Sequence, residues 1–308
     1  MDALTDTAVA IAIGMAGHRR WGRTGTLWLI AAANLPQLER VVAAGSLAAW
    51  MRVVFGAGHS LFTTPLLGLA LAAPLARRLH NWKAAATIVG LGLGSHLALD
   101  LLSGPGVRLF WPLSSSLYGF DLLADYDLLT LAVLAFALIG PQMLNLVNQD
   151  IGAKAYSPQK PARAGLLVVA LLIALRAGTM LLLEDRAESP AASVLSPSQL
   201  NPLTWYVITD AGTAYTVDEI TPWGNGPSLR FRKAGPNRAF ETAADTPLAE
   251  AFLEMARFPQ YSLERGEKGM LVRLRDLRFY TPAGEGKEYS IEIEVTPQLQ
   301  VVSEKARM

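Results

Sequence analysis

Cysteine is absent from the 308-residue sequence. This absence excludes disulfide bonds, thiolate metal ligands and cysteine nucleophiles, and it is compatible with any redox compartment. Charged residues are also scarce, because they make up 17% of the chain, whereas typical soluble domains carry about 25%. The formal net charge of +1 gives no electrostatic reason to expect a nucleic-acid partner, so we predict none.

The shortage of charge is confined to residues 7–183, which contain long apolar stretches. A helix needs roughly 20 apolar residues to cross a bilayer. We therefore expect about four full spans, at residues 61–76, 84–102, 122–147 and 164–183. Three shorter apolar segments precede them. Residues 8–17 and 26–35 predict a short helical hairpin buried against the other helices, and 41–54 predict an interfacial segment.

Charge also predicts the orientation of the chain. The first charges are Asp2 and Asp6, whereas a signal peptide begins with basic residues, so we expect the N-terminus to remain in the mature protein. Basic residues mark cytoplasmic loops, and here they gather at 18–23, 77–83 and 154–163. These loops alternate with the spans. They predict a multi-pass protein of the inner (cytoplasmic) membrane whose C-terminal domain is extracytoplasmic.

The C-terminal part of the chain has the pattern of a soluble domain. We predict a helical membrane domain at 1–185, a linker rich in Ser and Pro at 186–202, and a mostly β domain at 203–308. Strand-like runs occur at 205–209, 214–220, 228–232, 270–280 and 289–296, and a helix is expected at 247–258. The predicted fold class is an α-helical membrane bundle followed by a soluble α+β domain with a mainly antiparallel sheet. This domain could bind an external protein or envelope partner.

Ionisable residues inside a span are costly in lipid, so they are informative. His96 and Asp100 are four positions apart and lie on one helix face, with Gly92 one turn earlier. The pair could bind a metal, relay protons, or form a structural hydrogen bond to a neighbouring helix. Arg176, in the last span, could snorkel to the interface or pair with a carboxylate.

The predicted topology places further ionisable residues on the same, external side. They are Asp6, Glu39, His59, Asp125 and Asp127. Two imidazoles with several carboxylates suit Zn²⁺, and Mn²⁺ or Fe²⁺ are possible. The carboxylates could equally be solvated groups at helix ends, where negative charge is favoured near an N-terminus.

The run from Gly94 to Pro112 is similar to the signature SHLxxDxxTxxGvxlfWP, with Ser103 at the threonine position. That signature belongs to a family of inner-membrane-associated metal-dependent hydrolases, first noted as LexA-binding and distantly similar to zinc-dependent phospholipase C. The resemblance covers roughly residues 1–150.

Three other motifs of that family are partly retained. LTH reads Leu4-Thr5-Asp6, and LPDxD reads Leu35-Pro36-Gln37-Leu38-Glu39. The motif HRGxTHS keeps Gly56, His59 and Ser60, while Val54, Phe55 and Gly58 replace its His, Arg and Thr. The lost His-Arg pair would remove expected contacts to a phosphate-like substrate.

The resemblance implies a membrane-bound metal-dependent hydrolase acting on a membrane lipid or another phosphoester-type substrate. It implies a divalent metal, zinc first, held by His59, His96 and Asp100 with Asp6 and Glu39 as substitute oxygen donors. Glu39 or Asp125 would act as the general base. The alternative is a non-catalytic membrane protein with a degenerate site that anchors an external binding domain. A transporter or proton relay through His96 and Asp100 is a third reading.

Overall fold

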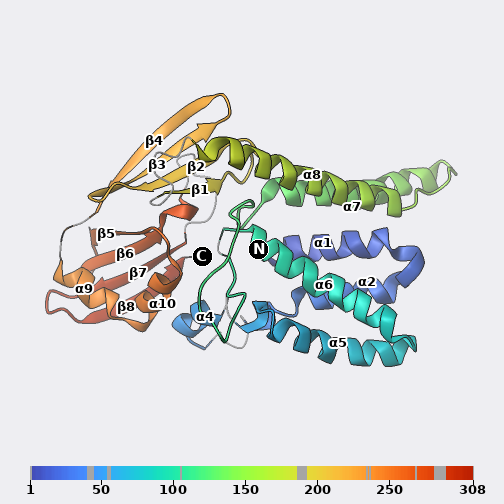
Figure 1. The fold of residues 1–308 in the computed structure, drawn as a ribbon, viewed down its shortest axis with the longest axis horizontal. Coiled ribbons are helices and arrows are strands. Elements are labelled where there is room, and N and C mark those ends of the chain that lie inside the picture. The colour runs from blue at the N-terminus through green and yellow to red at the C-terminus, as the bar shows by residue number, and fades with distance from the viewer. Residues whose placement is uncertain are drawn as a thin grey trace. The chain divides into compact units, whose positions relative to one another are not determined.

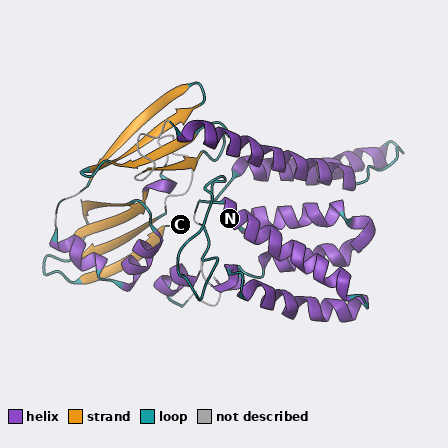
Figure 2. Ribbon diagram, in the orientation of Figure 1, coloured by secondary structure: helices purple, strands orange, loops and turns teal. Residues whose placement is uncertain are grey.

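The computed structural model describes residues 2–39, 45–53, 57–104, 106–185, 193–233, 235, 237–267, 269–280 and 289–307. It divides into two compact units (Figures 1 and 2). The helical unit comprises Met1–Glu39 and Phe55–Arg176, and the second unit comprises Arg40–Val54 and Ala177–Met308. The helical region followed by an antiparallel β domain confirms the coarse fold class predicted from the sequence.

The first unit is built from helices in the order α1 (Ala3–Ala16), α2 (His18–Asn34), η1 (Ala57–His59), α5 (Thr63–Leu79), α6 (Trp82–Leu102) and α7 (Leu128–Asp150), followed by α8 (Gln159–Glu184) as far as Arg176. The predicted N-terminal hairpin is present, since α1 and α2 pack against each other. Gly17 joins them, and Gly22 interrupts α2 with a φ of 61° that only glycine adopts at little cost.

Among the described residues, three helices are long and apolar enough to cross a membrane: α6, α7 and α8. The predicted count of four full spans is not confirmed. The segment expected to span at 61–76 forms α5, which has 17 residues and carries Arg77 and Arg78 in its last turn. That length is short of the roughly 20 residues a span needs. Residues 122–127, placed in the third span, precede α7, because the Asp127 side chain caps this helix at Thr130 N, 2.8 Å away.

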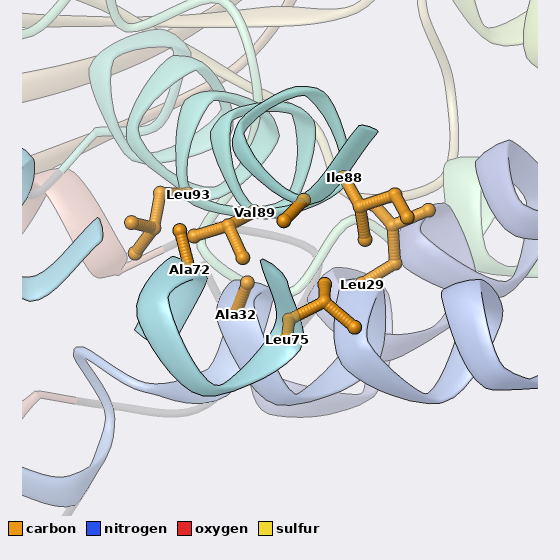
Figure 3. Close-up of a cluster of buried hydrophobic side chains, with 8 residues drawn as sticks. Leu29, Ala32, Ala72, Leu75, Ile88, Val89 and Leu93 are labelled. Carbon is orange, nitrogen blue, oxygen red and sulfur yellow. The ribbon is translucent and has the colours of Figure 1, made fainter. Parts of the chain in front are cut away.

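The helices α2, α5 and α6 share a hydrophobic core. Its buried side chains include Leu29 and Ala32 from α2, Leu75 from α5, and Ile88 and Val89 from α6 (Figure 3). A second cluster joins α1, α6, α7 and α8 through Val9, Leu99, Leu134 and Val169, together with Ala12 and Leu123. The second cluster packs α1 against α6, and α6 carries the His96–Asp100 pair.

The three basic turns lie at one end of the helical unit. They join α1 to α2, α5 to α6, and α7 to α8 (Figure 1). His96 and Asp100 occupy the last two turns of α6, so they lie toward the opposite end of that helix from the basic turn that precedes it.

In the part of the second unit that the structure describes, the strands form two four-stranded antiparallel sheets, where one sheet was expected. The first sheet consists of β1 (Ser193–Pro197), β2 (Trp205–Asp210), β3 (Ala214–Thr221) and β4 (Gly224–Arg232). The second consists of β5 (Pro259–Arg265), β6 (Met270–Asp276), β7 (Ser290–Val295) and β8 (Val301–Arg307). In both sheets the strands follow sequence order, so each is a simple meander. Residues 277–279, predicted as strand, form the short helix η2 (Leu277–Phe279).

Strand β1 lies within residues 186–202, which the sequence predicted as a linker. Ser193 pairs with Thr209 and Pro197 with Trp205, and the burial of Leu195 gives this strand a reason to join the sheet. Of the remaining linker residues, 186–192 lie outside the described part of the chain.

Helices α9 (Arg238–Ala244) and α10 (Pro247–Met255) lie between the two sheets in the sequence. The predicted helix at 247–258 corresponds to α10, which ends earlier, at Met255. Strand β5 begins at Pro259. The second unit also includes α4 (Leu47–Val53), the described part of the apolar segment predicted at 41–54. Helix α4 packs on α10, where Arg52 lies 3.3 Å from Glu250.

Candidate metal centre

Helix α6 presents two of the polar site residues. His96 and Asp100 are one turn apart, and both side chains are buried. Gly92, one turn before His96, brings the helix against α2: a Cβ at this position would lie 2.6 Å from Ala32 Cβ and 2.8 Å from Leu29 O. This glycine therefore permits close packing of α6 against α2.

The third residue, His59, comes from the short helix η1. Two hydrogen bonds fix the chain just after it: Ser60 Oγ donates to Trp111 O at 2.5 Å, and Leu61 N donates to Leu109 O at 2.9 Å. The backbone carbonyls of Leu109 and Trp111 thus fix the chain next to the histidine. Burial lowers the pKa of His59, which favours the neutral ring.

The three side chains converge on one point. Asp100 Oδ2 lies 3.1 Å from His59 Nε2 and 3.3 Å from His96 Nε2, and the two imidazole rings have centroids 5.0 Å apart. Two atoms bound to one tetrahedral zinc at about 2.0–2.1 Å are about 3.3 Å apart. The observed spacing therefore fits three ligands of a shared cation.

The hydrogen-bonding of His96 supports this fit. Its Nδ1 lies 2.9 Å from Asp6 Oδ2, so we assign the ring proton to Nδ1. Nε2 then offers a lone pair toward the Asp100 carboxylate, and this buried nitrogen has no hydrogen-bond partner among the described residues. Two electron-rich atoms facing each other at 3.3 Å are stabilised when a cation lies between them. His59, His96 and Asp100 are the group within the described residues that could hold a metal ion.

Two further carboxylates lie behind the histidines. Asp6, from α1, contacts the far side of His96 and accepts a hydrogen bond from Gln37 Nε2 at 3.0 Å. Glu39 Oε2 lies 3.9 Å from His59 Nδ1. Asp6 and Glu39, predicted as direct ligands, are thus beside the Nδ1 atoms, while both Nε2 atoms face Asp100.

The structure adds Gly58 to the residues of the site, because it lies against the Glu39 side chain. Gly58 leaves no room for a side chain, because a Cβ there would collide with the Glu39 carboxylate. Burial raises the pKa of Glu39 to about 7, although a backbone hydrogen bond from Gly58 opposes this shift. The position of Gly58 directly before His59 in a partly retained motif was the available signal.

The other predicted residues are not members of this group. Asp125, predicted as an alternative general base, is half-buried before α7 and is not among the three residues that share the candidate metal position. Its catalytic role stays a prediction. Asp127 forms an ion pair with Arg176, with 2.6 Å between Asp127 Oδ2 and Arg176 Nη1. Of the two roles considered for Arg176, the structure therefore shows pairing with a carboxylate.

A comparison with protein-family models identifies the family to which the chain belongs. The family model of the YdjM inner membrane protein matches residues 1–181. The chain belongs to the YdjM family. No curated protein and no solved structure gives a match. The YdjM match covers every helix from α1 to α7 and most of α8 and ends before β1, so it supports membership in an inner-membrane family. Hydrolase activity, zinc and the likeness to phospholipase C stay predictions.

Proposed function

We propose that this YdjM-family protein is a membrane-bound metal-dependent hydrolase that acts on a lipid or phosphoester-type substrate. The observation that carries the proposal is the convergence of His59 Nε2, His96 Nε2 and Asp100 Oδ2 within a buried part of the helical unit. Burying two imidazoles and a carboxylate is costly without compensation. A shared divalent cation is the compensation that their arrangement favours.

Each residue has a separate role in this proposal. His59, His96 and Asp100 hold the metal, with zinc the first choice and manganese or iron also compatible with two histidines and one carboxylate. When bound, the metal would polarise an oxygen of the substrate and acidify a water molecule. Asp6 accepts the Nδ1 proton of His96 and thereby fixes the orientation of this ring. Glu39 is the candidate proton acceptor, next to His59.

The departures from the family motifs support an altered site over a decayed one, because they occur in contacting pairs. Asp6 occupies the position of the histidine in the LTH motif of the hydrolase family, and Gln37 occupies the position of the first aspartate in its LPDxD motif. The Gln37 side chain donates a hydrogen bond to Asp6. Glu39 is one methylene longer than the second aspartate of the LPDxD motif, and Gly58 lacks the side chain of the threonine in the HRGxTHS motif. Their contact shows that the longer side chain occupies the space left by the smaller residue.

The position of the site along the helices supports an external, outer-leaflet location. The three basic turns lie at one end of the helical unit (Figure 1), and basic residues favour the cytoplasmic side. His96 and Asp100 lie toward the other end of α6. A substrate in the outer leaflet would then reach the site, and the chain after α8 would be extracytoplasmic.

Metal analysis tests the first requirement. Full-length protein in detergent, dialysed against equimolar Zn²⁺, Mn²⁺ and Fe²⁺, should retain close to one metal ion per chain. His96→Ala and Asp100→Asn should each lose that ion, while His18→Ala, which removes an exposed histidine, should not. Retention of metal by His96→Ala would refute the proposed centre.

Activity is tested on the same proteins. The metal-loaded wild type should hydrolyse bis(p-nitrophenyl) phosphate or fluorescent phosphatidylcholine in vesicles, and Asp100→Asn should be inactive. Stoichiometric metal without hydrolysis of either probe would favour the alternative, a non-catalytic membrane protein that anchors an external binding domain.

A further inference from the structure

The helical unit has an apolar groove between α7 and α8. It has a volume of about 640 Å³ and is lined by residues of α7 between Ala132 and Leu144 and by residues of α8 between Pro161 and Val168, all of them apolar. Phe136, in its wall, is 81% exposed. Both helices are long and apolar enough to cross a membrane, so the groove opens toward hydrocarbon and not toward water.

The two helices already touch beside the groove, so it cannot close by their moving together. A Cβ at Gly165 of α8 would lie 2.5 Å from Ala137 Cβ of α7. Val133 of α7 packs against a buried cluster that includes Val169 of α8. At Gly140, in contrast, an added Cβ would meet no atom within 4 Å. The groove is therefore open next to Gly140, and an occupant has room there.

The length of the groove matches one leaflet of a bilayer. From Ala132 to Leu144, α7 rises about 18 Å at 1.5 Å per residue, whereas half of the hydrocarbon core is roughly 15 Å thick. On α8 the lining begins at Pro161, in the first turn of the helix. The groove therefore suits one acyl chain of a lipid whose headgroup lies at the level of the turn between α7 and α8.

Exposed basic residues lie at this end of the groove. Lys160 is one turn before Ala164 on the same face of α8, and Lys154 belongs to the turn itself. A helical side chain points back toward the N-terminus of its helix, so Lys160 extends from the groove toward the membrane surface. Residues 150–163 contain three basic residues against the one acidic Asp150. This excess of positive charge suits an anionic headgroup.

A second copy of the chain is a less suitable occupant. Two copies that met symmetrically through this groove would bring both pairs of Lys154 and Lys160 to the same end of the interface. Like charges placed together weaken such an interface. An anionic headgroup has the opposite effect, because it would neutralise the lysines of a single copy.

We propose that the groove binds one anionic phospholipid, with an acyl chain between α7 and α8 and the headgroup phosphate beside Lys154 and Lys160. Basic turns favour the cytoplasmic side, so this lipid belongs to the cytoplasmic leaflet, where anionic lipids attract basic residues next to a span. His96 and Asp100 lie toward the opposite end of α6 from the basic turns (Figure 1). The lipid is therefore separate from the proposed substrate, and its binding does not depend on hydrolase activity.

Native mass spectrometry of the delipidated full-length protein tests the proposal. The probes are palmitoyl-oleoyl phosphatidylglycerol and palmitoyl-oleoyl phosphatidylcholine, which have the same acyl chains and differ in net charge. We expect the first phosphatidylglycerol to bind the wild type about tenfold more tightly than the first phosphatidylcholine, as two lysines beside an anionic headgroup should produce. Equal affinities would overturn the proposal.

A pair of double variants tests the headgroup contact. Lys154→Gln with Lys160→Gln should remove the preference for phosphatidylglycerol. The matched control is Arg78→Gln with Lys83→Gln, which removes the same charge from exposed residues beside the turn that joins α5 to α6, and it should keep the preference. An undiminished preference in the first variant, or an equal loss in both, would overturn the proposal.

A second pair of variants locates the acyl chain. Gly140→Trp fills the groove from α7 and should abolish the tight binding of phosphatidylglycerol, whereas Gly178→Trp, at an exposed position of α8 outside the groove lining, should leave it unchanged. Wild-type affinity in Gly140→Trp would overturn the proposal. A wild-type dimer that Gly140→Trp dissociates would also overturn it, because a second copy would then occupy the groove. Circular dichroism checks folding, and the lysine variants decide if Gly140→Trp does not fold.

Discussion

Asp6 and His96 are 90 positions apart in the sequence, yet the aspartate Oδ2 lies 2.9 Å from the imidazole Nδ1. Both side chains are almost completely buried. The contact joins α1 to α6 and turns His96 so that Nε2 faces Asp100. The residue at the weakened LTH motif is therefore placed behind the histidine, where a carboxylate supports a metal ligand from the far side.

The first prediction follows from this arrangement. Asp6→Ala should weaken metal binding by about 10–100-fold, the typical cost of losing a carboxylate that orients a ligating histidine. Replacing a residue that ligates the metal directly should abolish metal binding, as we expect for Asp100→Asn. Competition with a chromogenic chelator measures both affinities. Asp150→Asn, at the exposed end of α7, is the control, and an unchanged affinity in Asp6→Ala would contradict the orienting role.

The second prediction concerns Glu39 and Gly58, which occupy each other's space. Gly58→Ala should displace the Glu39 carboxylate and weaken both metal affinity and stability. Combining it with Glu39→Asp, which shortens the side chain, should restore part of the loss. Residues in contact typically show a coupling of about 0.5–3 kcal/mol, measurable in a double-mutant cycle of metal affinities. Additive effects would mean that Glu39 and Gly58 act independently of each other.

The third prediction compares three glycines of one helix. Gly92→Ala forces a Cβ against Ala32 and the backbone of α2, so it should destabilise the helical unit by about 1–3 kcal/mol. Gly90 and Gly94 have no atoms within 4 Å of an added Cβ. Alanine at these positions should be neutral or stabilising, since it has the higher helix propensity. Thermal unfolding in detergent tests the contrast, and equal effects of all three would refute close packing at Gly92.

The sequence indicated which residues could form the site but not how their side chains are arranged. The spacing of His96 and Asp100 put both on one face of α6, and the observed helix has this geometry. The placement of Asp6 and Glu39 on the far sides of the imidazoles depends on how α1, α2 and η1 pack, which no local pattern contains. The space left at Gly58 is likewise visible only when Glu39 is beside it.

The sheets show a similar limit. The strands recognised from the sequence are rich in β-branched and aromatic residues, as in Trp205–Asp210. The missed strands β1, β5 and β8 contain many polar or charged residues and lie at the edges of their sheets. Edge strands need only one partner and are partly solvated, so hydrophobic pattern identifies them poorly.

The last prediction concerns Arg176 and Asp127, a buried ion pair in the helical unit. Arg176 Nη1 lies 2.6 Å from Asp127 Oδ2 and donates to Leu122 O at 3.2 Å, so it ties α8 to the segment that starts α7. Breaking a buried pair leaves one charge uncompensated and typically costs about 3–5 kcal/mol. Arg176→Leu alone should therefore strongly destabilise the protein in detergent.

The paired variant Arg176→Leu with Asp127→Asn should recover much of this stability. It removes both charges, and the asparagine retains an oxygen that can cap α7 at Thr130 N. Lys160→Leu is the control, because Lys160 also lies on α8 but is exposed. Unfolding by a denaturing detergent measures all four proteins. If the double variant is no more stable than Arg176→Leu, the cost comes from lost packing of the arginine and not from the unpaired carboxylate.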